Sequence, residues 1–284
     1  MKNALTISGL TKTYQDFILD HVSFAVPSGS IVGLIGENGA GKSTTINAAL
    51  GLIQRDGGQV SILGKEEIDG DTKEQIGVVF DGSNYPEILS PRKLNRVMKN
   101  MYRLWEEQTY FQLLKRFSLP FDKQIKQFSK GMKMKLAISV AFSHQSNLLI
   151  LDEATSGLDP IVRDDILDML LEFVEKEERS VLVSSHITSD LEKIADYIVF
   201  LHKGKVVFSK PKDELIEQYG MIKCGAAQFG TFDQSDIVAY RKMEYEWQVL
   251  VSNREKMQKK YPKAMIVPVT MDEIMLLYVK GEKR

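Results

Sequence analysis

The sequence predicts an α/β protein whose mainly parallel sheet is covered on both faces. Short apolar runs alternate with segments of helical periodicity through most of the 284 residues. Three of these runs lead directly into Gly36, Asp152 and His186, residues that suit phosphate binding or catalysis. Strands that alternate with helices form parallel sheets, and functional groups gather at the carboxyl ends of such strands.

The first part of the chain is expected to be rich in strands. Apolar alternation or short apolar runs predict strands at 5–8, 17–26, 31–35, 59–63 and 76–80. The residues after the third run, 44–50, predict a helix that stops near Gly51.

The period then changes to that of helices. Apolar residues from Leu94 to Trp105 recur three and four apart, the pattern continues to Phe117, and 131–142 predicts a further helix. We therefore expect an α-helical insert over 85–145. Trp105, Tyr102, Phe111 and Met101 are candidates for a docking groove on this insert, with packing inside its own core as the alternative.

The strand signal returns after the insert. Strands are expected at 148–151, 181–184, 197–202 and 205–208, with helices at 161–178 and 188–195 between them. A different tail begins at Pro211, with a helical segment at 214–219 and short apolar runs near 221–222, 247–252 and 265–269. A capping box at 270–273 opens a last helix.

Composition narrows the class of protein. The net charge of −1, from 37 basic and 38 acidic residues, gives no basic field, so we expect no nucleic-acid partner. The single cysteine, Cys224, excludes an internal disulfide and suits a reducing cytoplasm. No apolar run reaches the roughly 18 residues that span a bilayer, and no signal-peptide core opens the chain. We therefore expect a soluble chain that reaches a membrane only through a partner.

Residues 36–43 match the phosphate-loop pattern G-x-x-x-x-G-K-S and stand between a predicted strand and a predicted helix. The glycines allow backbone N–H groups to turn toward phosphate oxygens, Lys42 reaches the outer phosphates, and the Ser43 hydroxyl can bind Mg²⁺. The residues expected to bind the phosphates are Gly36, Asn38, Gly39, Ala40, Gly41, Lys42, Ser43 and Thr44.

The apolar run 148–151 ends in two adjacent acids, Asp152 and Glu153. Acids at a strand end hold Mg²⁺ and activate water. Together with the phosphate loop, these two acids therefore predict a nucleotide hydrolase. The alternative, two acids that cap the following helix, does not explain the buried run before them.

In their order along the chain these motifs resemble the nucleotide-binding subunit of an ATP-binding cassette (ABC) transporter, over about residues 3–215. The resemblance implies a P-loop NTPase (RecA-like) core at 1–84 and 146–215 with an antiparallel β subdomain. It also implies an α-helical subdomain at 85–145, and the tail 216–284 is expected to be a small α+β appendage. ATP and Mg²⁺ are the implied cofactors.

The resemblance assigns roles to single residues. Tyr14 would stack on adenine, with an aromatic on a half-exposed strand as the alternative. Asp152 would bind Mg²⁺, Glu153 would be the general base, and His186 would contact the γ-phosphate. Lys42, Glu153 and His186 are thus the catalytic candidates. Asp81 stands where the family usually has Gln; it is kept as a metal-site residue with Ser43 and Asp152, and the alternative is a turn over 81–84.

Residues 129–131 resemble the family's signature turn, with Lys130 in place of a Gly and, next to it, Met132 in place of a Gln. The resemblance implies that Ser129 and Gly131 hold the γ-phosphate of ATP bound by a second copy, and that Asp159 couples the two sites. The implied partners are a second ATP-binding subunit, identical or different, arranged head to tail, and a separate membrane-spanning subunit.

The tail and the Lys-Gly-Met form of the signature resemble bacterial exporters of drugs and peptides. The chain would then be peripheral at the cytoplasmic face of the cell membrane. Two alternatives remain: a soluble ABC ATPase that acts on ribosomes or DNA, and a regulatory subunit that binds ATP with little turnover.

Overall fold

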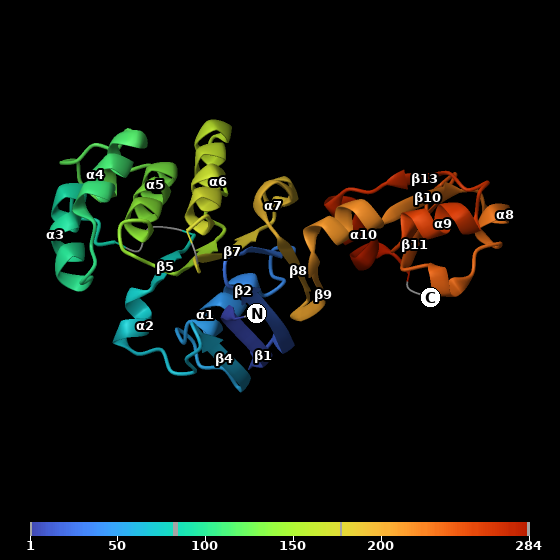
Figure 1. The fold of residues 1–284 in the computed structure, drawn as a ribbon, viewed down its shortest axis with the longest axis horizontal. Coiled ribbons are helices and arrows are strands. Elements are labelled where there is room, and N and C mark those ends of the chain that lie inside the picture. Colours follow the sequence, from blue (N-terminus) through green and yellow to red (C-terminus); the bar gives the residue numbers. More distant parts are fainter. Residues whose placement is uncertain (1, 82–84, 177, 283–284) are drawn as a thin grey trace.

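The computed structural model describes residues 2–81, 85–176 and 178–282 and confirms the α/β class. A six-stranded sheet in the order β5-β6-β7-β3-β8-β9 crosses the centre of the molecule (Figure 1). Its strands are β3 (Ile31–Ile35), β5 (Ile76–Val79), β6 (Leu148–Asp152), β7 (Ser180–Ser185), β8 (Tyr197–His202) and β9 (Lys205–Pro211). All neighbours pair in parallel except β8 and β9, which are antiparallel.

The central sheet is buried on both faces because alternate side chains of its strands belong to different cores. Ile31 and Ile35 of β3 pack in the core that holds α5 (Lys130–Ala141), α6 (Pro160–Val174) and α7 (Thr188–Ile194). Val32 and Leu34 pack in the core that holds α1 (Lys42–Ala49). Figure 1 shows α5, α6 and α7 on one side of the sheet and α1 on the other.

A second, antiparallel sheet in the order β2-β1-β4 lies on the α1 side. It consists of β1 (Asn3–Thr13), β2 (Ile18–Pro27) and β4 (Gly57–Ile62). β1 has 11 residues, whereas the apolar run predicted a strand only at 5–8. The strand is longer because β2 and β4 pair with it on both sides, so the backbone hydrogen bonds extend past the apolar residues.

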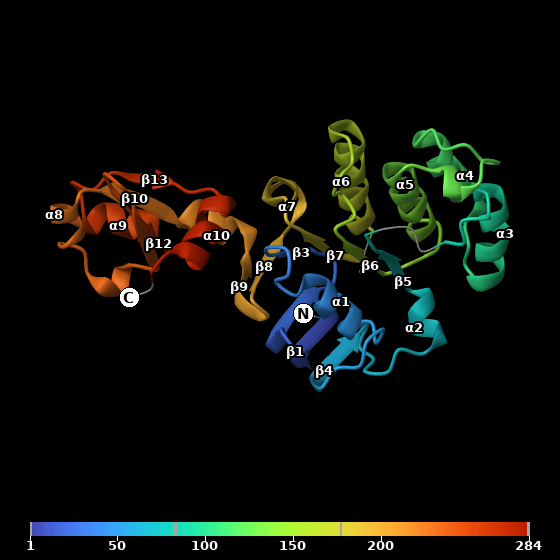
Figure 2. The ribbon, with the colours of Figure 1, turned by 180° about the vertical axis from the view of Figure 1, so that it is seen from behind.

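The insert contains α3 (Pro91–Met101), α4 (Glu107–Arg116) and α5, and Figure 2 shows them gathered at one end of the molecule. Tyr102, Trp105 and Phe111 pack against the main core, whereas Met101 is 62% exposed. Of the four docking candidates, Met101 alone is thus a surface side chain. The short α2 (Gly70–Glu74) was not predicted, because five residues are too few for a helical period.

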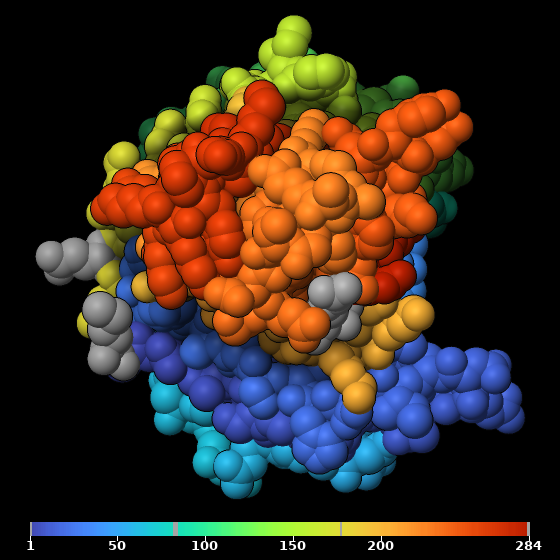
Figure 3. Space-filling model, turned by 90° about the vertical axis from the view of Figure 1, so that its right-hand side faces the viewer, coloured from blue at the N-terminus to red at the C-terminus, as the bar shows by residue number. Residues whose placement is uncertain are grey.

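The tail forms a separate four-stranded antiparallel sheet in the order β11-β12-β10-β13. Its elements are a π-helical turn (Glu214–Gln218), β10 (Gly220–Cys224), α8 (Ala226–Phe229), β11 (Ala239–Lys242), β12 (Trp247–Val251), α9 (Arg254–Lys260), β13 (Ile266–Pro268) and α10 (Met271–Lys280). The predicted capping box at Thr270 and Glu273 is present. Figure 3 shows this tail covering one end of the molecule.

The last helix joins the tail to α7, which packs on the central sheet. The Thr188 hydroxyl donates to Asp272 at 2.9 Å, and the Met271 N–H donates to Glu192 at 3.1 Å. Ile274 and Leu277 belong to the same core as α7. Within the described ranges no helix is both long enough and apolar enough to cross a membrane.

Candidate functional site

The phosphate loop joins β3 to α1 at the carboxyl edge of the central sheet. Gly41 precedes α1 with φ 109°, a conformation that L side chains rarely adopt. A Cβ at Gly36 would lie 2.4 Å from the Leu201 carbonyl oxygen, so a larger residue would displace the loop. No side chain caps α1, which leaves its positive helix end directed at the loop.

A cavity of about 740 Å³ opens beside this loop. It brings together residues from the loop, from the ends of β5, β6 and β7, and from the end of the turn before β2. The lining residues are Asp16, Phe17, Asn38, Gly39, Gly41, Lys42, Ser43, Thr44, Asp81, Glu153, Ser156 and His186. Asp81, Glu153 and His186 lie far from the loop in sequence, so the parallel sheet assembles the site as expected.

Lys42, Glu153 and His186 form a continuous polar chain across the cavity. The Lys42 ammonium donates to the Gly36 carbonyl at 2.8 Å and lies 3.1 Å from Glu153 Oε1. Glu153 Oε2 lies 2.5 Å from His186 Nδ1. Lys42 is only 6% exposed, so its charge acts at close range with little screening by water.

Glu153 stands in a left-handed backbone conformation, with φ 54°. Such a conformation in a non-glycine residue costs about 1–3 kcal/mol and persists where the surroundings fix it. Here the Glu153 N–H donates to the Ser184 hydroxyl at 3.1 Å, and that hydroxyl donates to Asp152 Oδ1 at 2.6 Å. Ser184 thus positions both acids.

Sequence reasoning missed Ser184, although its place two residues before His186 at the end of an apolar run was a usable signal. Asp152 itself is 5% exposed and lies behind the cavity rather than on its wall.

Ser43, Asp81 and Asp152 offer the oxygen donors that Mg²⁺ prefers. The described residues contain no cluster of three or more His, Cys, Asp or Glu side chains that could hold a metal by themselves. Mg²⁺ is typically bound by one or two carboxylates together with waters and substrate phosphates, so this sparse donor set fits it. The alternative turn at Asp81 involves 82–84, which lie outside the described residues.

Tyr14 does not line the cavity. The residue is 45% exposed, its N–H donates to the Phe17 carbonyl at 2.8 Å, and the Lys12 ammonium lies 5.5 Å from its ring centre. Phe17, which the sequence did not single out, lines the cavity beside Gly41.

Ser129, Gly131 and Asp159 also lie outside the cavity wall. The Ser129 hydroxyl accepts from the Met132 N–H at 3.2 Å at the start of α5, and Asp159 accepts from the Val162 N–H at 3.1 Å at the start of α6. Both therefore cap helices of their own chain.

Asp190 of α7 is a buried acid that sequence reasoning missed. Its carboxylate accepts from Arg163 Nε at 2.6 Å and 2.7 Å and from the Thr155 hydroxyl at 3.1 Å. Thr155 follows Glu153 by two residues and Asp190 follows His186 by four. Asp190 therefore fixes the positions of the segments that carry Glu153 and His186.

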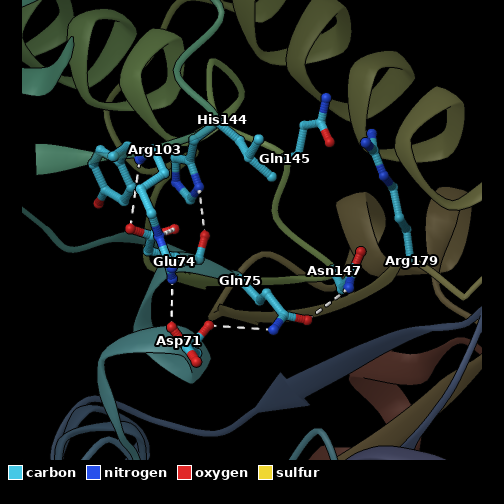
Figure 4. A pocket seen from close by; sticks show the side chains of 10 residues that line it. Asp71, Glu74, Gln75, Arg103, His144, Gln145, Asn147 and Arg179 are labelled. Carbon is cyan, nitrogen blue, oxygen red and sulfur yellow. Dashed lines mark hydrogen bonds and ion pairs between the residues drawn. The ribbon is translucent and has the colours of Figure 1, made fainter.

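A second cavity of about 570 Å³ lies between the insert and the central sheet (Figure 4). Arg103 makes ion pairs with Asp71 and Glu74 there. Gln75 and Asn147, on its wall, precede β5 and β6. This cavity thus lies at the amino ends of the strands, opposite the edge that carries the phosphate loop.

Comparison with known proteins gives similarities over most of the chain. A family model described as ABC transporter matches residues 19–156. A lantibiotic transport ATP-binding protein of Streptococcus pyogenes is 36% identical over 212 residues, which cover 74% of this chain and 91% of the relative. A bacitracin transport ATP-binding protein of Bacillus licheniformis is 33% identical over 76% of this chain and 72% of the relative. A solved ATP-binding subunit of an ABC transporter is 32% identical, with a TM-score of 0.69, over 80% of this chain and 93% of that one.

Proposed function

This chain belongs to the ATP-binding proteins of ABC transporters, and we propose that it hydrolyses ATP to drive a membrane-spanning partner that exports peptides, drugs or other amphipathic compounds. The observation that carries the proposal is the set of contacts that joins Lys42, Glu153 and His186 in one cavity beside the phosphate loop. The relatives' names, lantibiotic and bacitracin transport, support the cargo class.

The phosphate loop and Lys42 would hold the phosphates. Backbone N–H groups of Gly39 to Thr44 and the start of α1 supply positive potential, and the buried Lys42 ammonium supplies a full charge. Ser43, Asp152 and Asp81 would hold Mg²⁺, which neutralises phosphate charge when bound.

Glu153 would act as the general base. Its carboxylate lies within hydrogen-bond reach of both Lys42 and His186, so its position is set from two sides. His186 would hold that carboxylate and contact the γ-phosphate. Tyr14 would stack on the adenine ring outside the phosphate cavity.

Ser129, Gly131 and Asp159 would serve the ATP of a second copy. They lie on their own chain's α5 and α6 starts and do not line its phosphate cavity. A head-to-tail dimer, of two identical chains or of this chain with another ATP-binding subunit, brings the two half-sites together. Loss of the γ-phosphate would then open the dimer.

The separate membrane-spanning subunit would place this chain at the cytoplasmic face of the cell membrane. The insert, with the exposed Met101, is the surface that we propose for docking.

Purification of the tagged chain from detergent-solubilised membranes tests the transport role. We expect a polytopic membrane chain to co-purify and phosphate release to accompany it. Recovery with ribosomes or DNA, together with nucleic-acid-stimulated and salt-sensitive hydrolysis, would contradict the proposal. ATP binding without turnover would favour the regulatory alternative instead.

A further inference from the structure

Lys130 and Asp81, two positions at which this chain departs from the pattern of its family, contact each other. Lys130 Nζ lies 2.7 Å from Asp81 Oδ1. Asp81 lines the phosphate cavity, whereas Lys130 is the first residue of α5 and follows Ser129 directly. The ion pair therefore links the wall of the chain's own site to the turn that would serve a second copy.

Further contacts join residues 87–89 to α5 and to the residues just before it. Lys133 of α5 makes an ion pair with Glu87 at 2.6 Å, and the Lys126 N–H donates to the Glu87 carbonyl at 3.0 Å. The Ile125 N–H donates to the Leu89 carbonyl at 2.9 Å. The start of α5 is thus attached to residues 87–89 as well as to Asp81.

Because both charges are exposed, Asp81 can readily exchange Lys130 for another positively charged partner. The Lys130 side chain is 60% exposed and that of Asp81 is 50% exposed. Exposed ion pairs contribute little to stability because water screens them and the side chains lose freedom. A divalent cation, which selects carboxylate oxygens, is a stronger partner for Asp81 than a screened ammonium is.

We propose that Lys130 is a positioning residue: it holds the Asp81 carboxylate as its counter-ion until a nucleotide and its divalent cation bind, and then releases it to them. The inference rests on the proposed function. Release leaves the Lys130 ammonium unpaired beside Ser129, where a second copy's ATP would lie. When one copy binds its nucleotide, the positive charge that this copy presents to the ATP of the second copy would thus rise.

The two departures are required together for this exchange. With Gln and Gly at these positions neither side chain carries a charge, so there is no ion pair to exchange. With Asp81 alone, an unpaired carboxylate would face the phosphates and the Glu153 carboxylate across the cavity and weaken binding of a nucleotide without its cation.

Calorimetric titration with ADP tests the exchange, since ADP is not hydrolysed. The measured quantity is the ratio of the dissociation constant in EDTA to that in excess Mg²⁺. We expect Lys130→Ala to raise this ratio about two- to fivefold, because Asp81 then repels bare ADP and meets Mg²⁺ without competition. Asp81→Asn should lower the ratio, and Lys130→Ala should have no further effect in the Asp81→Asn background.

Lys133→Ala is the matched control, because it removes another ion pair between α5 and a residue that follows β5 in sequence. Glu87, the partner of Lys133, does not line the phosphate cavity, so the ratio should not change. An equal shift in Lys133→Ala, or an unchanged effect of Lys130→Ala after Asp81→Asn, would overturn the inference while leaving the proposed function intact. Failure of the unmodified chain to bind ADP would overturn the proposed function itself.

Discussion

Apart from Lys42, Glu153 and His186, Asp190 is the residue whose removal we expect to cost the most stability. Asp190 is 4% exposed, and its carboxylate accepts hydrogen bonds from both Arg163 and Thr155. The change Asp190→Ala removes this carboxylate. Breaking a buried ion pair costs about 3–5 kcal/mol, because the remaining charge stays buried without a partner. The Arg163 side chain keeps 25% exposure and is partly hydrated, so we expect roughly 2–4 kcal/mol of unfolding free energy to be lost.

Urea denaturation followed by circular dichroism measures this loss. The matched control is Lys193→Ala, since Lys193 joins the same two helices through Asp164 at 2.7 Å. Both partners of that pair are more than half exposed, so its removal should cost much less. Asp190→Asn, which keeps an acceptor for Thr155, should fall between the two.

The reasoning on Asp190 would be refuted if Asp190→Ala cost no more stability than Lys193→Ala. It would also fail if phosphate release by folded Asp190→Ala equalled that of the unmodified chain, because Asp190 fixes the segments that carry Glu153 and His186.

Three further changes have defined outcomes. Burial lowers the pKa of His144 below its ordinary value of 6.5. As the pH drops below 6.5, the unfolded chain therefore takes up a proton before the folded chain does, and the free energy of unfolding falls. His144→Asn should flatten this pH dependence in urea titrations at about pH 5 and about pH 7.5. Gly36→Ala places a Cβ 2.4 Å from the Leu201 carbonyl oxygen and should weaken ADP binding about tenfold or more in calorimetry. Tyr14→Ala should cost about 1–3 kcal/mol of ATP binding if the ring stacks on adenine, whereas Tyr14→Phe should bind as the unmodified chain does.

Local sequence predicted the parts of the site that depend on one segment. The spacing from Gly36 to Ser43 between an apolar run and a helix predicted a phosphate loop, and the structure has that loop between β3 and α1. The position of Asp152 and Glu153 at the end of an apolar run predicted their place at the edge of the sheet.

The structure adds contacts between residues that are distant in sequence. Neither the Asp190–Arg163 pair nor the Lys130–Asp81 pair follows from any local period, because each depends on how separate helices pack on the sheet. Phe17 was missed for a related reason. It is distant from Gly41 in sequence and lies beside it only in the folded chain. The tail's strands were seen only as short apolar runs, since their pairing is also long-range.

Phosphate release by the purified chain and by Glu153→Gln tests the central claim most directly. The substitution keeps the size of the side chain and removes the carboxylate that contacts Lys42 and His186. We predict that hydrolysis falls by roughly 100-fold or more, as expected for loss of a general base, and that the variant accumulates with ATP as a dimer in size-exclusion chromatography. A variant that stays monomeric and fully active would contradict both the role of Glu153 and the shared site.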